Sequence, residues 1–146
     1  MVPQRVTLIT LGAQSVPKLR SFYSALGWEE TPASSDDYSV FTTAGVLLSL
    51  YPYQDLLKDT NLDPGVHGQP SLTFSGITLA INVESAEEVD AVMASVKKHG
   101  AQILREPFEA VWGGRVGYFS DPEHHVWEVA YNPAAIFDES GAMISF

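Results

Sequence analysis

The chain has 146 residues, no cysteine and a formal net charge of −10. The lack of cysteine excludes disulfides, thiolate metal sites and a cysteine nucleophile, and it fits a cytoplasmic protein. The acidic charge disfavours nucleic acid and anionic membranes as partners, and the apolar runs are too short to span a bilayer. The first residues lack the features of a signal peptide, so we expect a cytoplasmic globular protein. Its acidic charge would tolerate or attract a cationic ligand.

The first 52 residues predict a β-α-β-β-β module. Ser15 is a good helix N-cap and Gly27 a good helix stop, and apolar residues between them recur at the spacing of one helix face. Apolar and β-branched runs favour four strands, at residues 5–11, 28–31, 38–42 and 46–51. The apolar helix positions are expected in the core rather than in a binding site.

The same pattern recurs in residues 76–133. Ser85 and Gly100 bracket a second amphipathic helix, and strands are predicted at 77–83, 102–105, 115–120 and 125–131. Residues 53–75, which are rich in Gly and Pro, form a connector between the modules. Residues 134–146 form a C-terminal tail with a turn at 139–141 between two apolar pieces.

The most informative segment is WGGRVGYFSDPEHHVWEVAYNP, which starts at Trp112. It predicts a β-hairpin whose turn is Asp121 to His124. Strand alternation places Glu128 on one face with Val126 and Ala130. A carboxylate buried there without a partner would be costly, so Glu128 is either solvated or part of a site.

Two such modules, the second ending in this hairpin, resemble the vicinal oxygen chelate superfamily of glyoxalases, bleomycin-resistance proteins and extradiol dioxygenases. The segments FYSALGW, LSLYP and INVESAEEVDAVM contribute to the resemblance. It implies a single α+β domain over residues 1–146, in which both modules form a curved mixed sheet around a central cleft. It also implies a homodimer. The chain departs from the family pattern at His124, where the turn usually has glycine.

The resemblance also implies where a metal would bind. In metal-dependent members, the first and last strands of each module supply one ligand each. In this chain those positions are Leu8, Ser49, Thr78 and Glu128. Only Glu128 is a metal-ligand side chain, and one carboxylate does not hold a catalytic metal, so we predict no metal cofactor.

The four histidines do not replace the missing ligands. His99 ends a helix, and His124 and His125 belong to a tight turn and point to opposite faces. His67 lies in the connector and is a candidate only if that segment reaches the cleft. A structural role is expected for His99, and the role of His67 stays open.

The expected cleft is apolar, with a few polar groups, as in many small-molecule sites. Its candidate lining residues, besides Glu128, are Leu8, Ser49, Tyr51, Thr78, Asn82, Trp112 and Arg115. Trp112 and Arg115 are either a stacking wall and a charge in the cleft, or a core residue and half of a surface ion pair.

The leading hypothesis is a protein that binds a small organic molecule in the cleft between its modules without the family metal, like the antibiotic-sequestering branch. The acidic charge would suit a cationic ligand. Two alternatives stay open. One is a divalent-metal-dependent lyase, isomerase or dioxygenase of the glyoxalase type. The other is a metal-free enzyme that uses Glu128 as general base, because burial would favour proton uptake by that carboxylate.

Overall fold

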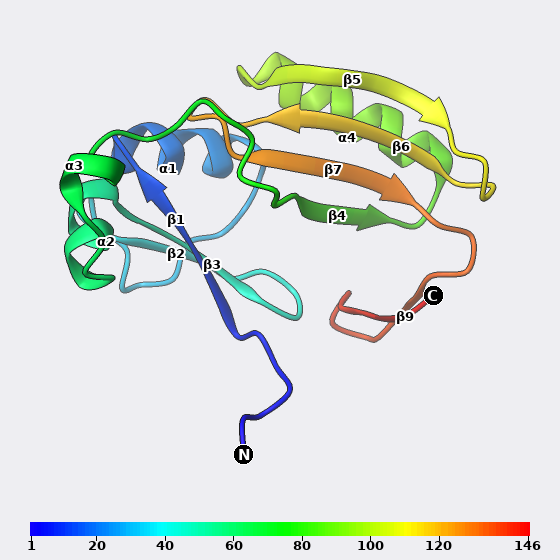
Figure 1. Ribbon diagram of the computed structural model, residues 1–146. Coiled ribbons are helices and arrows are strands. Elements are labelled where there is room, and N and C mark those ends of the chain that lie inside the picture. Colours follow the sequence, from blue (N-terminus) through cyan, green and yellow to red (C-terminus); the bar gives the residue numbers. More distant parts are fainter. The chain divides into compact units, whose positions relative to one another are not determined.

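The computed structural model describes residues 1–146, which form two compact units, Met1–Leu72 and Thr73–Phe146 (Figure 1). Each unit has its own sheet and its own long helix. None of the helices combines the length and the apolar composition that a membrane crossing requires.

The first unit is a three-stranded sheet with the order β1-β3-β2. Strand β1 (Leu8–Ala13) is parallel to β3 (Leu47–Pro52), and β2 (Ser39–Phe41) is antiparallel to β3. Helix α1 (Val16–Ala25) begins at the predicted cap, where the Ser15 hydroxyl accepts a hydrogen bond from the Lys18 N–H at 3.3 Å. Leu19, Phe22 and Tyr23 of the predicted apolar face are buried and Leu26 is half-buried, so α1 packs into the core together with strand residues.

The strand predicted at 28–31 is wrong, because a single bridge between Glu30 and Phe41 is all that forms there. The Glu30 carboxylate instead receives two hydrogen bonds from Arg20, at 2.6 and 2.8 Å. Pro32 follows almost at once and cannot donate a ladder hydrogen bond, so pairing does not extend further.

The connector carries more structure than its composition indicates. Helix α2 (Tyr53–Asp59) follows β3 directly, and the short helix α3 (Pro64–His67) begins at Asp63, whose side chain accepts from the Gly65 N–H at 2.8 Å. The Tyr53 hydroxyl donates to the backbone oxygen of His67 at 2.7 Å, which ties the two helices together.

The second unit is a four-stranded mixed sheet with the order β4-β7-β6-β5. Strand β4 (Leu79–Val83) is parallel to β7 (Val126–Tyr131), while β6 (Arg115–Ser120) is antiparallel to both β7 and β5 (Gln102–Glu109). Strand β5 runs past the predicted end at residue 105, with two register shifts against β6. Each shift interrupts the regular alternation of β5 side chains between the two faces of the sheet.

Helix α4 (Ala86–Lys98) packs along one face of this sheet (Figure 1). Of the predicted apolar face, Val89, Met93 and Val96 are buried, and Val92 is half-buried. A Cβ on Gly117 would lie 3.0 Å from the Met93 Cε atom, so the α4 side of β6 is closely packed. The tail forms a hairpin of β8 (Ile136–Phe137) and β9 (Met143–Ser145) around the predicted turn.

Candidate functional site

The turn between β6 and β7 sets the register of the candidate site. Asp121 is 1% exposed, and its Oδ1 atom accepts hydrogen bonds from the N–H groups of Glu123 at 2.9 Å and His125 at 3.0 Å. Its Oδ2 atom lies 2.8 Å from His125 Nδ1. His124 adopts the left-handed conformation, with φ of 72°. This network holds the two strands so that Tyr118 lies directly opposite Glu128.

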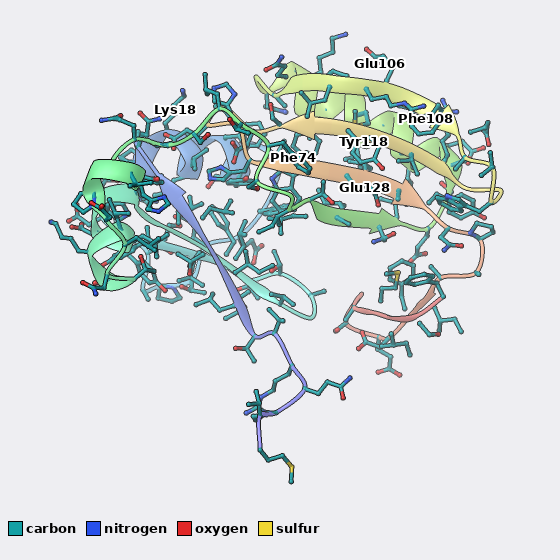
Figure 2. The ribbon with its side chains drawn as sticks, in the orientation of Figure 1. Lys18, Phe74, Glu106, Phe108, Tyr118 and Glu128 are labelled. Carbon is teal, nitrogen blue, oxygen red and sulfur yellow. The ribbon has the colours of Figure 1, made fainter.

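Glu128 and Tyr118 lie on the face of the sheet that is turned away from α4. Gly117 faces Met93 of α4, so its neighbour Tyr118 points to the other side. The Tyr118 hydroxyl donates a hydrogen bond to Glu128 Oε2 at 2.6 Å. Figure 2 shows Phe108, Tyr118 and Glu128 following one another across β5, β6 and β7.

The hydrogen bond changes the acidity of the tyrosine. The Glu128 carboxylate raises the pKa of Tyr118 above its ordinary value, through the hydrogen bond first, and desolvation adds to this. Both effects favour the neutral hydroxyl. Tyr118 is therefore a standing hydrogen-bond donor to Glu128, which lies half-buried rather than free in water.

The same row of the sheet continues to Arg105. Arg105 is the register partner of Tyr118 on β5, and its guanidinium carbon lies 3.4 Å from the centre of the Phe108 ring. Ala80 of β4 flanks Glu128 on the other side. One cross-strand row thus carries a carboxylate, a phenol hydroxyl and a guanidinium.

The other predicted residues of this unit lie in different places. Asn82 is on β4, opposite Ala130, and Thr78 is an exposed residue that precedes β4. Arg115 is on the α4 side of the sheet, away from Glu128. Its guanidinium binds the carboxylates of Asp90 at 2.8 Å and Glu109 at 3.2 Å.

Trp112 is 50% exposed, at the loop that leads into β6. A Cβ on Gly114 would lie 1.7 Å from the Trp112 ring, so the ring lies against the backbone of that glycine. Only a residue without a side chain leaves room for this contact. Trp112 is thus held locally and is not a fully buried core residue.

The predicted residues of the first unit share one face of its sheet. Leu8 pairs with Leu47 at the sheet edge and is 42% exposed. Ser49 is fully buried, and its hydroxyl lies 2.7 Å from that of Thr10. Asp59 raises the pKa of Tyr51, chiefly through its negative charge. None of these side chains is a strong metal donor.

The side chains at the four family ligand positions do not fit the divalent metal that metal-dependent members of this family bind. Leu8 offers no donor atom, and the Ser49 hydroxyl is engaged with Thr10. Glu128 is bonded to Tyr118. No group of three or more His, Asp or Glu side chains is arranged to hold a metal ion. We therefore derive no chemistry through a metal.

The histidines are placed elsewhere. The Nδ1 atom of His99 lies 2.8 Å from the backbone oxygen of Ser95 at the end of α4, as expected for a helix-terminal residue. His67 is exposed at the end of α3, and His124 is exposed in the hairpin turn. His125 pairs with the buried Asp121, a contact that the sequence did not indicate.

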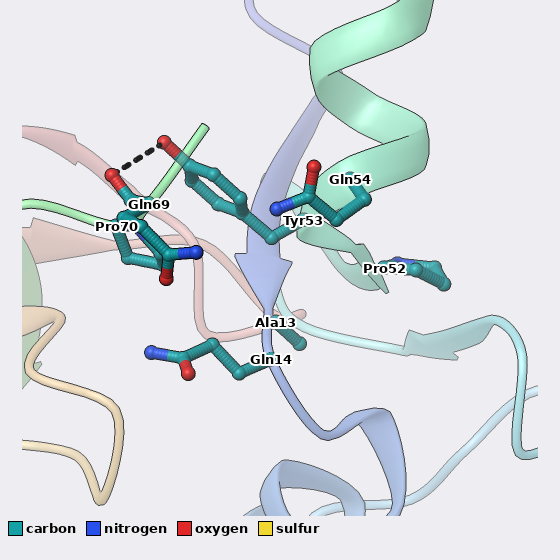
Figure 3. Close-up of a pocket in the computed structure, with 7 residues that line it drawn as sticks. All are labelled: Ala13, Gln14, Pro52, Tyr53, Gln54, Gln69 and Pro70. Atoms are coloured by element: carbon teal, nitrogen blue, oxygen red, sulfur yellow. Dashed lines mark hydrogen bonds between the residues drawn. The ribbon is translucent and has the colours of Figure 1, made fainter. Parts of the chain in front are cut away.

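A pocket of about 240 Å³ lies within the first unit, where the parallel strands β1 and β3 end (Figure 3). Its side chains are neutral and include three amides. They belong to Ala13, Gln14, Pro52, Tyr53, Gln54, Gln69 and Pro70. This pocket has no acid or base for catalysis, so the Glu128 face carries the candidate chemistry.

Sequence reasoning missed three residues of the Glu128 face. Tyr118 and Ser120 lie two residues apart on β6 and therefore share a face. Pairing the hairpin strands outward from the turn would have placed Tyr118 opposite Glu128. Ser120 is 3% exposed, and its hydroxyl is buried without a hydrogen-bond partner. Arg105 gave no signal, because its placement depends on the irregular pairing of β5.

Comparison with known proteins identifies the fold. The chain is similar to a glyoxalase-related enzyme from Fulvimarina pelagi, with 27% identity, a TM-score of 0.86 and coverage of 98% of this chain and 99% of that one. It also resembles a glyoxalase/bleomycin resistance protein/dioxygenase family enzyme from Burkholderia phytofirmans PsJN (16% identity, TM-score 0.75, coverage 87% and 98%). A lactoylglutathione lyase from Agrobacterium tumefaciens shares the fold at 15% identity (TM-score 0.65, coverage 90% and 96%).

No curated protein matches the chain. The model of the Glyoxalase/Bleomycin resistance protein/Dioxygenase superfamily matches residues 5–129, most of its length. These comparisons confirm the predicted α+β fold with curved mixed sheets. The chain therefore belongs to the glyoxalase/bleomycin resistance protein/dioxygenase superfamily.

Proposed function

We propose that this protein binds a small organic molecule on the Glu128 face of the β4-β7-β6-β5 sheet, without a catalytic metal. The observation that carries the proposal is the 2.6 Å hydrogen bond from Tyr118 to Glu128. It orients a half-buried carboxylate on the face of the sheet that is turned away from α4. A carboxylate held in this way binds a cationic or hydrogen-bond-donating group without further reorganisation.

The surroundings of Glu128 support ligand binding. Its row contains the exposed Ala80, and the next row contains the half-buried Phe108, beside a few polar groups. Val116 and Ala130 of the next row are buried beneath this surface. Small-molecule sites commonly combine an apolar surface with a few fixed polar groups. The superfamily to which the chain belongs includes bleomycin resistance proteins in its description, which is consistent with a role in sequestering a ligand.

A metal-free enzyme is the second candidate. Because Tyr118 occupies Oε2, the Oε1 atom of Glu128 remains to accept a proton from a bound substrate. Tyr118 would then hold the base in position and compensate the change in its charge. Replacing Glu128 with Gln would abolish turnover while keeping affinity, if the carboxylate acts as base.

A metal-dependent reaction of the glyoxalase type is the remaining alternative, suggested by the fold shared with the lactoylglutathione lyase. Elemental analysis of protein purified without a tag or chelator tests it. We expect less than about a tenth of an equivalent of divalent metal after soaking in Ni²⁺, Zn²⁺, Mn²⁺ or Fe²⁺, because one carboxylate does not retain these ions. A content near one equivalent would refute the metal-free site.

The binding proposal is tested by titrating the protein with benzylamine and related cationic aromatics, and following the amide signals of β6 and β7 by NMR. Glu128→Gln should weaken binding, whereas Glu139→Gln, on the exposed tail turn, should not. Equal binding by both variants would show that Glu128 is not part of the site. A cytoplasmic homodimer is also expected, which cell fractionation and light scattering would test.

A further inference from the structure

Two opposite charges on the Glu128 face lack partners of opposite sign. Glu128 forms no ion pair with a Lys, Arg or His, and its hydrogen-bond partner is the neutral Tyr118. Arg105 forms no ion pair with a carboxylate, although the chain has 18 acidic residues. Both charges nonetheless lie in one row of the same sheet.

Arg105, which is exposed, differs from Arg20 and Arg115 in its surroundings. Arg20 and Arg115 each bind two carboxylates. The guanidinium of Arg105 instead stacks on the Phe108 ring, with 3.4 Å from its central carbon to the ring centre. Stacking fixes the plane of the guanidinium and leaves its N–H edge free to bind an oxyanion with two hydrogen bonds.

The spacing of the strands sets the distance between the two charges. Glu128 is on β7 and Arg105 on β5, with β6 and its Tyr118 between them. Neighbouring strands lie about 4.8 Å apart, so the two backbones are roughly 10 Å apart. The Tyr118 ring is the surface over which a ligand would reach from one charge to the other.

We propose that the ligand of this face is a zwitterion with a flat, unsaturated or aromatic body. Its ammonium group binds Glu128, its carboxylate binds Arg105, and its body lies over the Tyr118 ring between them. This inference rests on the proposed binding function and specifies its ligand class. A molecule with both charges pairs each of the two side chains, whereas a simple cation leaves Arg105 without an anion.

The test uses isothermal titration and NMR on the full chain. The probes are 4-(aminomethyl)benzoate and 4-(2-aminoethyl)benzoate, with benzylamine and benzoate as the matched single-charge controls. We expect at least one zwitterion to bind roughly tenfold more tightly than either control, because it makes one more charge-assisted contact. Arg105→Gln should reduce that affinity to the level of benzylamine and leave benzylamine binding unchanged.

The controls separate this inference from the function on which it rests. Arg5→Gln removes an exposed arginine near the N-terminus and should leave all four affinities unchanged. Arg105→Lys keeps the charge but not the flat stacking surface, so it should retain only part of the gain. Thermal unfolding of each variant reports whether it is folded.

Two results would overturn the proposal of a zwitterionic ligand. Benzylamine that binds as tightly as both zwitterions, together with an Arg105→Gln variant of unchanged affinity, would refute the second charge contact and leave the Glu128 site intact. If no probe shifts the signals of β5, β6 and β7, both the zwitterion and the binding function on this face are refuted.

Discussion

The buried aspartate of the β6–β7 turn offers the sharpest test of how the site is held. Asp121 accepts two backbone N–H bonds, at 2.9 and 3.0 Å, and pairs with His125 at 2.8 Å. A hydrogen bond contributes about 1 kcal/mol net, and more when buried donors are left unpaired. Asp121→Ala removes three, so we expect the free energy of unfolding to fall by roughly 3 kcal/mol.

The chain contains a matched control. Asp138 makes the same pattern of bonds in the tail turn, from the N–H groups of Ser140 at 2.8 Å and Ala142 at 3.0 Å, but it is exposed. The hydrogen bond from the Ser140 side chain and those from the backbone lower the pKa of Asp138, so they stabilise the fold, but water replaces much of this when the side chain is removed. Asp138→Ala should therefore cost clearly less than Asp121→Ala. The two substitutions differ mainly in burial.

Urea unfolding followed by circular dichroism measures both variants. Asp121→Asn adds a third point, because an amide keeps one acceptor oxygen for the backbone but loses the charge that pairs with His125. It should cost about half as much as Asp121→Ala. A loss of less than about 1 kcal/mol of unfolding free energy in Asp121→Ala would be no more than a single exposed hydrogen bond contributes. It would show that the buried network does not hold the hairpin register.

Three further predictions concern charge and backbone strain. Arg20 lowers the pKa of Glu30 below 4.5, chiefly through its hydrogen bonds. This pair therefore stabilises the fold above pH 4.5, and the stabilisation is lost as the pH falls through the lowered pKa. In Glu30→Gln, the free energy of unfolding, measured with urea over a pH series, should fall less steeply in acid. Glu128 raises the pKa of Tyr118 above 10.0. The resulting stabilisation of the fold is present below pH 10 and is lost as the pH rises through the raised pKa. NMR titration of labelled tyrosine should therefore give a lower midpoint for Tyr118 in Glu128→Gln. His124→Gly should raise the free energy of unfolding by up to about 1 kcal/mol, since relief of left-handed strain exceeds the added entropy of the unfolded chain, and a loss of stability in urea unfolding would contradict this.

Much of the fold follows from local sequence patterns. Helix α4 and the β6–β7 hairpin lie where caps, glycine stops and alternation placed them. Predictions that relied on a short run alone were weaker. Residues 28–31 form only a bridge, with backbone hydrogen bonds from Thr31 to Val40 and from Thr42 to Glu29, because Pro32 ends the pairing. A run of four residues has too little periodicity to outweigh this effect.

The candidate site was predictable in part. Alternation indicated the neighbours of Glu128 on its own strand, but its hydrogen-bond partner comes from the facing strand. Arg115 was a candidate for the cleft, and the structure places it on the α4 side of the sheet with Asp90. Alternation along β6, counted from the turn, places Arg115 on the face opposite to Tyr118, whereas its partner Asp90 comes from another element.

The sequence by itself determined the two-module pattern, the hairpin, the face of Glu128 and the absence of metal donors at Leu8 and Thr78. These depend on residue type and on spacing within one element, which local geometry decides. Only the tertiary structure decided that Tyr118 donates to Glu128, and that Arg105 lies in the same row and stacks on Phe108 of the next row. Those contacts depend on the register between strands and on the shifts in β5, and register is set by the packing of whole elements.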